Sequence, residues 1–184
     1  MWKSIFAASF LSLGCLALSA CSDDESKPSF VACESTYALC TTAKCTPADG
    51  STDTVDCACD VKTGYSAGEK PCTGKSESSK GTGISSRYYP IKSYAACDSD
   101  RPWAWCLDKP CIVDKDDPTK ASCACTVTKN EGLYLVVTDT YTDTTCTTDL
   151  WSSATVQGVN QITDFLKTTS ELKPYDIKVL NAPK

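Results

Sequence analysis

The chain has 184 residues, of which 22% are charged and 41% are hydrophobic, and its formal net charge at pH 7 is −5. This composition is typical of a globular protein and excludes wholesale disorder. Because the chain contains no histidine, Ser-His and Cys-His nucleophile pairs, a histidine general base and histidine-ligated metal sites are excluded. The acidic balance, with arginine only at Arg87 and Arg101, argues against a nucleic-acid partner.

Residues 1–20 carry one cation, Lys3, ahead of an apolar run that is followed by small residues. This pattern predicts a secretory signal peptide, because the run is too short to span a membrane. The run ends in Leu18-Ser19-Ala20-Cys21, which resembles the lipobox of bacterial lipoproteins. That resemblance implies cleavage before Cys21, lipidation of this residue with fatty acids such as palmitate, and stable membrane anchoring through several acyl chains. The alternative is an ordinary secretory signal that is cut after Ser19.

The residues that follow Cys21 indicate the destination of the anchored protein. In the lipoprotein class, a serine at the position of Ser22 implies release to the outer membrane. The acidic stretch from Cys21 to Glu25 is similar to the surface-export tag of Bacteroidetes lipoproteins, and an acidic tether is the alternative. We therefore expect a lipid-anchored protein of the cell envelope, in the outer membrane, with residues 21–32 as a tether and surface display as a further hypothesis.

The cysteines predict a disulfide framework. Apart from Cys15 in the predicted signal peptide and Cys21 at the predicted anchor, twelve cysteines remain, an even number outside the cytoplasm. Their sequence steps are 7, 5, 12, 2 and 13 in a first set of six and 9, 5, 12, 2 and 21 in a second, so the three central steps coincide. The two sets are Cys33, Cys40, Cys45, Cys57, Cys59 and Cys72, and Cys97, Cys106, Cys111, Cys123, Cys125 and Cys146.

An offset of 66 residues aligns 37–66 with 103–132 without a gap, and several residues between the cysteines match. This internal similarity predicts a duplicated module, with the first copy at 33–72 and the second at 87–146. Homologous copies should use the same disulfide pairing. The sequence leaves that pairing open, although a bond within either Cys-x-Cys pair would be strained. The Gly-, Ser- and Lys-rich stretch 73–86 predicts a flexible linker or an exposed loop.

Alternating patterns predict short strands at 55–63 and 121–129, with the cysteines facing inward, and a further strand at 132–138. The segment 87–94 is strand-like, but Pro90 within it favours a sheet edge. We also expect a short strand at 175–180.

The C-terminal part, 147–184, contains the one predicted helix. Its apolar residues recur at helical spacing, Ser152 or Ser153 is the expected N-cap, and Pro174 is expected to stop the helix. We expect this part to pack on the second module. The predicted fold class is a small, disulfide-rich, mainly antiparallel β protein with one C-terminal helix (α+β).

The cysteines and aspartates are candidates for two kinds of metal site and for a redox function, and each also has a structural interpretation. Four cysteines at this spacing could bind zinc, and a Cys-x-Cys pair could exchange disulfides, but export favours structural bridges. The aspartates at 49–56 and 114–117 could bind calcium, although their spacing does not fit a helix-loop-helix calcium site. Solvated acidic turns are therefore the preferred interpretation, and we expect no metal or cofactor.

Arg101, Trp103 and Trp105 form the candidate ligand surface. Because the two indoles are at alternate positions of an extended segment, both rings could face one way and stack on a sugar. Their repeat partners Tyr37 and Leu39 are also apolar, which favours packing against the disulfides instead.

The sequence favours a non-catalytic lipoprotein whose two modules present a binding surface to a protein or a glycan. One alternative is an inhibitor of hydrolases such as proteases or lysozymes, because crosslinked modules offer stiff loops such as 46–56. A second alternative, from a different class, is a histidine-independent enzyme such as a glycosidase with two catalytic carboxylates. No two acidic residues are distinguished by their context, so no catalytic residue is predicted.

Overall fold

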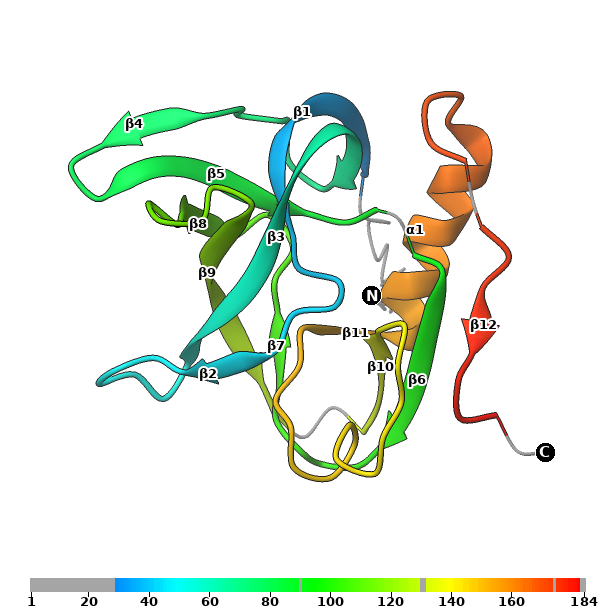
Figure 1. Cartoon of the computed structure of the whole chain (residues 1–184). Helices are drawn as coiled ribbons and strands as arrows, with labels where there is room; N and C mark the ends of the chain where they lie inside the picture. The colour runs from blue at the N-terminus through cyan, green and yellow to red at the C-terminus, as the bar shows by residue number, and fades with distance from the viewer. Residues whose placement is uncertain (1–28, 90, 130–131, 174, 183–184) are drawn as a thin grey trace, which may run out of the picture.

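The computed structural model describes residues 29–89, 91–129, 132–173 and 175–182. These residues form two β sheets and one helix, which lies beside the smaller sheet (Figure 1). The predicted signal peptide, Cys21 and most of the tether lie outside the described residues. Within the described part of the chain, no helix has both the length and the apolar character needed to cross a membrane.

Five strands of the larger sheet close into a barrel. They follow one another around it in the order β3, β1, β5, β8 and β9, and β9 pairs back with β3. All of these pairings are antiparallel except that of β1 with β5. The eight strands of this sheet are β1 (Val31–Leu39), β2 (Cys45–Pro47), β3 (Thr54–Gly68), β4 (Ser76–Ser78), β5 (Gly81–Arg87), β7 (Trp103–Trp105), β8 (Pro110–Val113) and β9 (Lys120–Thr128).

The interior of the barrel is filled by disulfides and small side chains. Along β3, Val55, Cys57 and Cys59 are buried, whereas Asp56 and Ala58 between them are exposed. The predicted strands with inward cysteines are therefore confirmed. Sulfur atoms of different bridges touch, since Cys57 Sγ lies 3.5 Å from Cys106 Sγ. The core cluster combines four bridges with residues such as Ala38, Ile84 and Ala104.

Both cysteine sets use the same pairing. In each set the first cysteine bonds to the sixth, the second to the fifth and the third to the fourth. The bonds are Cys33 with Cys72, Cys40 with Cys59, Cys45 with Cys57, Cys97 with Cys146, Cys106 with Cys125, and Cys111 with Cys123. The expectation of six bridges and of one common order is confirmed.

The strand registers repeat at the same offset of 66 residues. The pairing of Tyr37 with Lys62 on β1 and β3 is matched by that of Trp103 with Thr128 on β7 and β9. The β2 and β3 register is likewise repeated by β8 and β9. Between the two halves, β3 and β9 pair antiparallel around Cys57 opposite Cys123, two positions that correspond in the repeat. The segments that carry the first and the second cysteine set are therefore related by a local two-fold axis where β3 pairs with β9.

The stretch 73–86, predicted as a flexible linker or an exposed loop, is exposed at residues 75–80 but continues into a barrel strand. Residues 76–87 form the hairpin of β4 and β5, and β5 is a barrel strand. Gly81, at φ 121°, accommodates the turn, since a side chain disfavours that conformation. Ile84 faces the core, and the Ser86 hydroxyl donates to the Cys106 carbonyl. Two bridges of each cysteine set therefore share the core of one barrel.

The smaller sheet has the order β11, β10, β6, β12. Its strands are β6 (Ser93–Asp98), β10 (Leu133–Val137), β11 (Ser153–Thr155) and β12 (Lys178–Val179). The strand predicted at 132–138 is confirmed as β10, whereas the one expected at 175–180 is reduced to β12. The segment 87–94 is not one strand, because β5 ends at Arg87 and β6 begins at Ser93.

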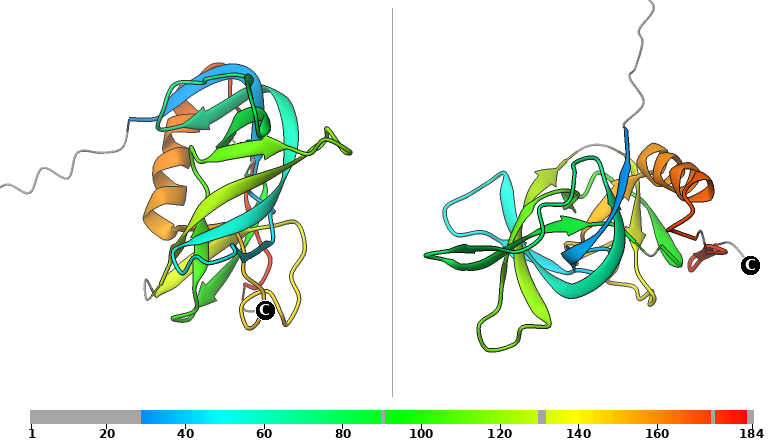
Figure 2. Two further views of the ribbon diagram at one scale, coloured as in Figure 1. Left: turned by 90° about the vertical axis from the view of Figure 1, so that its left-hand side faces the viewer. Right: turned by 90° about the horizontal axis from the view of Figure 1, so that it is seen from above.

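Helix α1 (Val156–Thr168) is the predicted C-terminal helix, and Figure 2 shows it along one side of the molecule. Its N-cap is Thr155, whose hydroxyl accepts from the Gly158 amide, and not the predicted Ser152 or Ser153. The reason is that β11 pairs with β10 and keeps the chain extended up to Thr155. The expected stop, Pro174, lies outside the described residues.

Residues Val159, Ile162 and Leu166 of α1 are buried. They pack in clusters that also include Leu135 of β10, and Ala67 of β3 at the end of the first cysteine half. The C-terminal part thus contacts both halves, and not only the second as expected.

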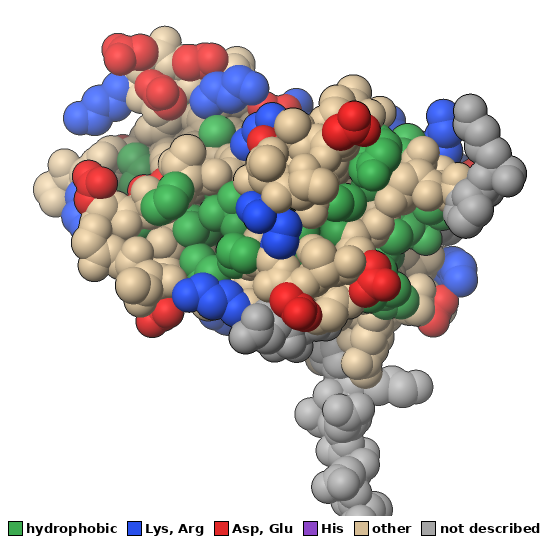
Figure 3. Space-filling model, turned by 90° about the horizontal axis from the view of Figure 1, so that it is seen from below, with side chains coloured by type: hydrophobic (Ala, Val, Ile, Leu, Met, Phe, Trp, Pro, Cys, Tyr) green, Lys and Arg blue, Asp and Glu red, His purple; other side chains and the backbone are tan. Residues whose placement is uncertain are grey.

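The surface carries charges of both signs, and the face in Figure 3 shows acidic and basic side chains beside one another with apolar side chains between them. The ion pair of Lys120 with Asp60, at 2.6 Å, links β9 to β3. A side-chain hydrogen bond from Lys120 lowers the pKa of Asp60. The Lys120 side chain is exposed and that of Asp60 is half-buried, so solvent screens this pair and it contributes little to stability.

Candidate ligand-binding cavity

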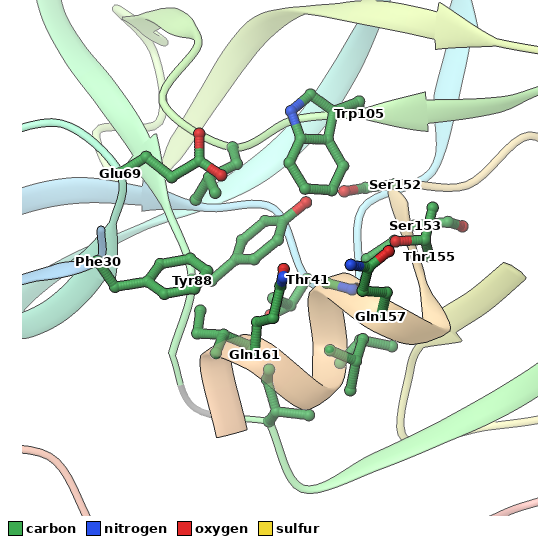
Figure 4. Close-up of a pocket in the computed structure, with 17 residues that line it drawn as sticks. Phe30, Thr41, Glu69, Tyr88, Trp105, Ser152, Ser153, Thr155, Gln157 and Gln161 are labelled. Atoms are coloured by element: carbon green, nitrogen blue, oxygen red, sulfur yellow. Dashed lines mark hydrogen bonds between the residues drawn. The ribbon is translucent and has the colours of Figure 1, made fainter. Parts of the chain in front are cut away.

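A cavity of about 130 Å³ lies where the barrel, the smaller sheet and the beginning of α1 meet (Figure 4). Its lining comes from segments that are far apart in sequence. Phe30 precedes β1, Tyr88 follows β5, and Trp105 ends β7. The remaining lining residues are Thr41, Glu69, Ile91, Leu107, Val137, Ser152, Ser153, Ala154, Thr155, Gln157, Gly158, Val159, Gln161 and Ile162.

The wall of the cavity is mainly apolar and aromatic. Phe30, Tyr88 and Trp105 contribute three rings, and aliphatic side chains from four other segments complete the wall. The Tyr88 and Trp105 ring centroids are 6.1 Å apart with an interplanar angle of 74°, an edge-to-face contact that fixes both rings. An enclosed apolar wall with a few polar groups is the usual composition of a small-molecule site.

The hydroxyl of Tyr88 is the polar group that distinguishes the cavity. Tyr88 is only 5% exposed, and its hydroxyl makes no hydrogen bond to any other described residue. In Figure 4 this hydroxyl points toward the space between Trp105 and Ser152. A buried hydroxyl without a partner costs about 1 to 3 kcal/mol, and a ligand with a hydrogen-bonding group would remove that cost.

Burial raises the pKa of Tyr88 well above the ordinary value of 10.0. The polar groups of Ser152 and of the Cys106 backbone reduce this rise, although they lack hydrogen-bond geometry toward the phenol. The phenol therefore keeps its proton at neutral pH and can donate it to a ligand.

Two other polar side chains of the lining already have partners and two lie at the mouth, whereas Thr41 and Ser152 are buried. The Thr155 hydroxyl caps α1, and the Ser153 hydroxyl donates to the Trp151 carbonyl. Glu69 and Gln157 are exposed, which places them at the mouth of the cavity and not inside it.

An ion pair supports three parts of the lining. Arg87, which is 1% exposed, donates to Asp108 at 3.0 Å, and also to Ser66 Oγ and to the carbonyls of Val31 and Lys70. The backbone amide of Glu69 donates to Asp108 Oδ2 at 2.7 Å. Tyr88 and Leu107 are the chain neighbours of Arg87 and Asp108. The pair therefore positions residues on three sides of the cavity.

The candidate ligand surface is not assembled as a platform. Trp103 is buried and stacks on Tyr134, and the Arg101 side chain donates to the Thr148 carbonyl. Of the three predicted residues, only Trp105 lines the cavity. Trp103 packs in a cluster that contains the Cys97–Cys146 disulfide as well as Tyr134, which agrees with the preferred interpretation of packing against the disulfides.

The sulfur clusters do not offer thiolates to a metal ion. Three groups of three cysteines lie within ligand distance of one another among the described residues, but every member is in a disulfide. Among the aspartates weighed as calcium ligands, Asp114 accepts from the Asp116 and Asp117 amides, and Asp117 accepts from Thr119. These contacts are turn interactions.

Sequence reasoning missed Tyr88 and Glu69. Tyr88 was included in a strand-like segment, and nothing in the sequence separates it from its neighbour Tyr89. Whether a phenol lacks a partner depends on tertiary packing. Trp105 carried the only local signal for this cavity.

No protein-family model, curated protein or solved structure matches this chain.

Proposed function

We propose that the chain is a non-catalytic, lipid-anchored binding protein of the cell envelope, and that it holds a small, mainly apolar ring compound in this cavity. The observation that carries the proposal is the buried Tyr88 hydroxyl, which faces an apolar, ring-lined space without a partner. The ligand would place its ring against Trp105 and Phe30 and a hydroxyl or carbonyl group at Tyr88.

The size and polarity of the cavity favour a ring compound over the other partners that we considered. A cavity near 150 Å³ with apolar walls holds one benzene ring. A sugar of similar size carries several hydroxyls, and each would need a hydrogen-bond partner. Most of the lining residues are apolar or already bonded, so the cavity supports a small-molecule ligand in place of the expected glycan or protein.

Binding is also better supported than catalysis. A glycosidase needs two carboxylates about 5 to 10 Å apart. Among the described residues that line the cavity, Glu69 is the only carboxylate.

We further propose that the two cysteine sets are copies of one ancestral module. The common pairing order and the registers that repeat at an offset of 66 residues support this hypothesis. The copies have diverged at the cavity, because Trp105 corresponds to Leu39 in the first copy. Only the second copy would then supply an indole ring, that of Trp105, to the wall of the cavity.

The envelope location rests on the predicted lipobox. We propose that Cys21 carries the lipid and that the disulfides form after export. Labelling cells with a radioactive fatty acid tests the anchor. The label should follow the protein and disappear in Cys21→Ala, whereas unchanged labelling of that variant would refute the anchor without affecting the cavity.

Calorimetric titration of the purified, oxidised protein with benzyl alcohol and with toluene tests the cavity. We expect both to bind, and benzyl alcohol to bind roughly 3 to 10 times more tightly, because it adds one hydrogen bond to Tyr88. In Tyr88→Phe this preference should vanish while toluene still binds. Tyr141→Phe, which changes an exposed phenol, should retain it.

The proposal would be overturned if neither compound binds, or if Tyr88→Phe keeps the full preference for the alcohol.

A further inference from the structure

We infer that the ligand is a cation, an arylalkyl ammonium compound whose ring lies in the cavity and whose charge lies at the mouth beside Glu69. This inference rests on the proposed function and adds the chemical class of the ligand.

The described lining of the cavity carries negative charge only. Among the described residues that line it, Glu69 is the only charged one, and neither lysine nor arginine contributes to the lining. Glu69 also forms no ion pair with another described residue. An anionic ligand would therefore meet repulsion at the mouth without any compensating cation.

The nearest buried cation does not cancel the charge of Glu69. Arg87 is fully engaged by Asp108, by Ser66 and by two backbone carbonyls. Asp108 also accepts from the Glu69 amide, so the same network that neutralises Arg87 fixes the backbone from which the Glu69 side chain extends.

Three aromatic rings line the same cavity as the Glu69 carboxylate. In the view of Figure 4, Glu69 and Trp105 lie above Tyr88 and Phe30. The faces of aromatic rings attract organic cations, and the attraction strengthens where water is excluded. A carboxylate combined with three rings therefore favours an ammonium group over a neutral or negative one.

The Tyr88 hydroxyl and the Glu69 carboxylate can contact the same ligand. Because Tyr88 is buried and Glu69 is exposed, a hydrogen-bonding group on the ring would reach Tyr88 while a short alkyl chain carries the ammonium outward. Two rotatable carbons between ring and nitrogen would suit this arrangement.

The experiment compares the isosteric pair 2-phenylethylamine and 2-phenylethanol with phenylacetate, an anion of similar size, by calorimetry at low ionic strength and at pH 7. We expect the amine to bind roughly tenfold more tightly than the alcohol, and the carboxylate to bind most weakly. The preference for the amine should decrease at 0.5 M salt, because screening weakens an exposed charge pair.

Glu69→Gln should weaken binding of the amine roughly five- to tenfold and leave binding of the alcohol within about twofold. Glu77→Gln is the matched control, since Glu77 lies on the β4 hairpin, far from α1 in Figure 1. This control should bind all three probes as the unmodified protein does. Equal binding of amine and alcohol by the unmodified protein would overturn the inference and leave the proposed function standing. If none of the probes binds, both fail.

Discussion

Tyr88 carries the hydrogen-bonding group of the proposed ligand site at a cost to the stability of the folded protein. Its hydroxyl is buried without a partner, so the phenol contributes less stability than a phenylalanine ring would. We predict that Tyr88→Phe leaves the free energy of unfolding unchanged or raises it by up to about 1 kcal/mol, as measured by urea titration. A loss above about 1 kcal/mol would show that the hydroxyl is satisfied in the folded protein.

The same residue predicts a dependence on alkaline pH. Since burial raises the pKa of Tyr88 above 10.0, the unfolded chain releases this proton before the folded chain does. The free energy of unfolding should therefore fall as the pH rises above 10, by up to about 1.4 kcal/mol per pH unit from this group. Tyr88→Phe should reduce that slope. Equal slopes in both proteins between pH 8 and 11 would contradict the assignment.

Arg87 and Asp108 form the buried charge pair beneath the cavity. Their side chains are 1% and 6% exposed, and Asp108→Asn would leave the guanidinium without its counter-charge. We predict a loss of about 3 to 5 kcal/mol in the free energy of unfolding. Asparagine tolerates the positive φ of 53° at this position, so backbone strain adds little. The exposed Asp116→Asn is the control, and a loss of less than 1 kcal/mol at Asp108 would refute the role of the pair.

At the scale of single elements, the beginning of α1 offers a test. The Thr155 hydroxyl accepts from the Gly158 amide at 3.1 Å. Thr155→Ala should cost about 1 kcal/mol and speed hydrogen exchange of the Gly158 amide, whereas Thr155→Ser should preserve both. If alanine and serine behave alike, the capping role is wrong.

The elements also show which parts of the fold can be predicted from the sequence. The alternation of Val55, Cys57 and Cys59 predicts an inward-facing strand because the strand period is local. The capping pattern predicts the wrong N-cap because pairing of β11 with β10, which is not local, keeps residues 153–155 extended. The Gly- and Ser-rich composition of the β4 and β5 hairpin predicts a linker or loop, since turn composition does not reveal whether Ile84 is buried in a core.

For the whole molecule, the internal similarity predicts that both sets use one pairing order, but it predicts neither which order nor the barrel that unites the sets. Pairing of β3 with β9 brings two bridges of each set into one core. The cavity is likewise a product of the whole fold. Phe30, Tyr88 and Trp105 are far apart in the chain, and no local pattern brings them together.

The shared barrel predicts how the disulfides contribute. Cys45–Cys57 and Cys111–Cys123 occupy equivalent positions and span the same sequence separation of 12. Replacing either pair by alanines should cost roughly 2 to 4 kcal/mol, with similar losses and a single cooperative unfolding transition in both variants. Calorimetry checks this, and two separate transitions would indicate independently folding modules.

Intermolecular nuclear Overhauser effects between bound 2-phenylethylamine and the protein test the central claim most directly. We expect contacts from the ring protons to the methyl groups of Leu107, Val137 and Ile162, which line the cavity. Ring contacts only to methyl groups outside it, such as those of the exposed Leu133 and Val179, would show that the ligand binds elsewhere.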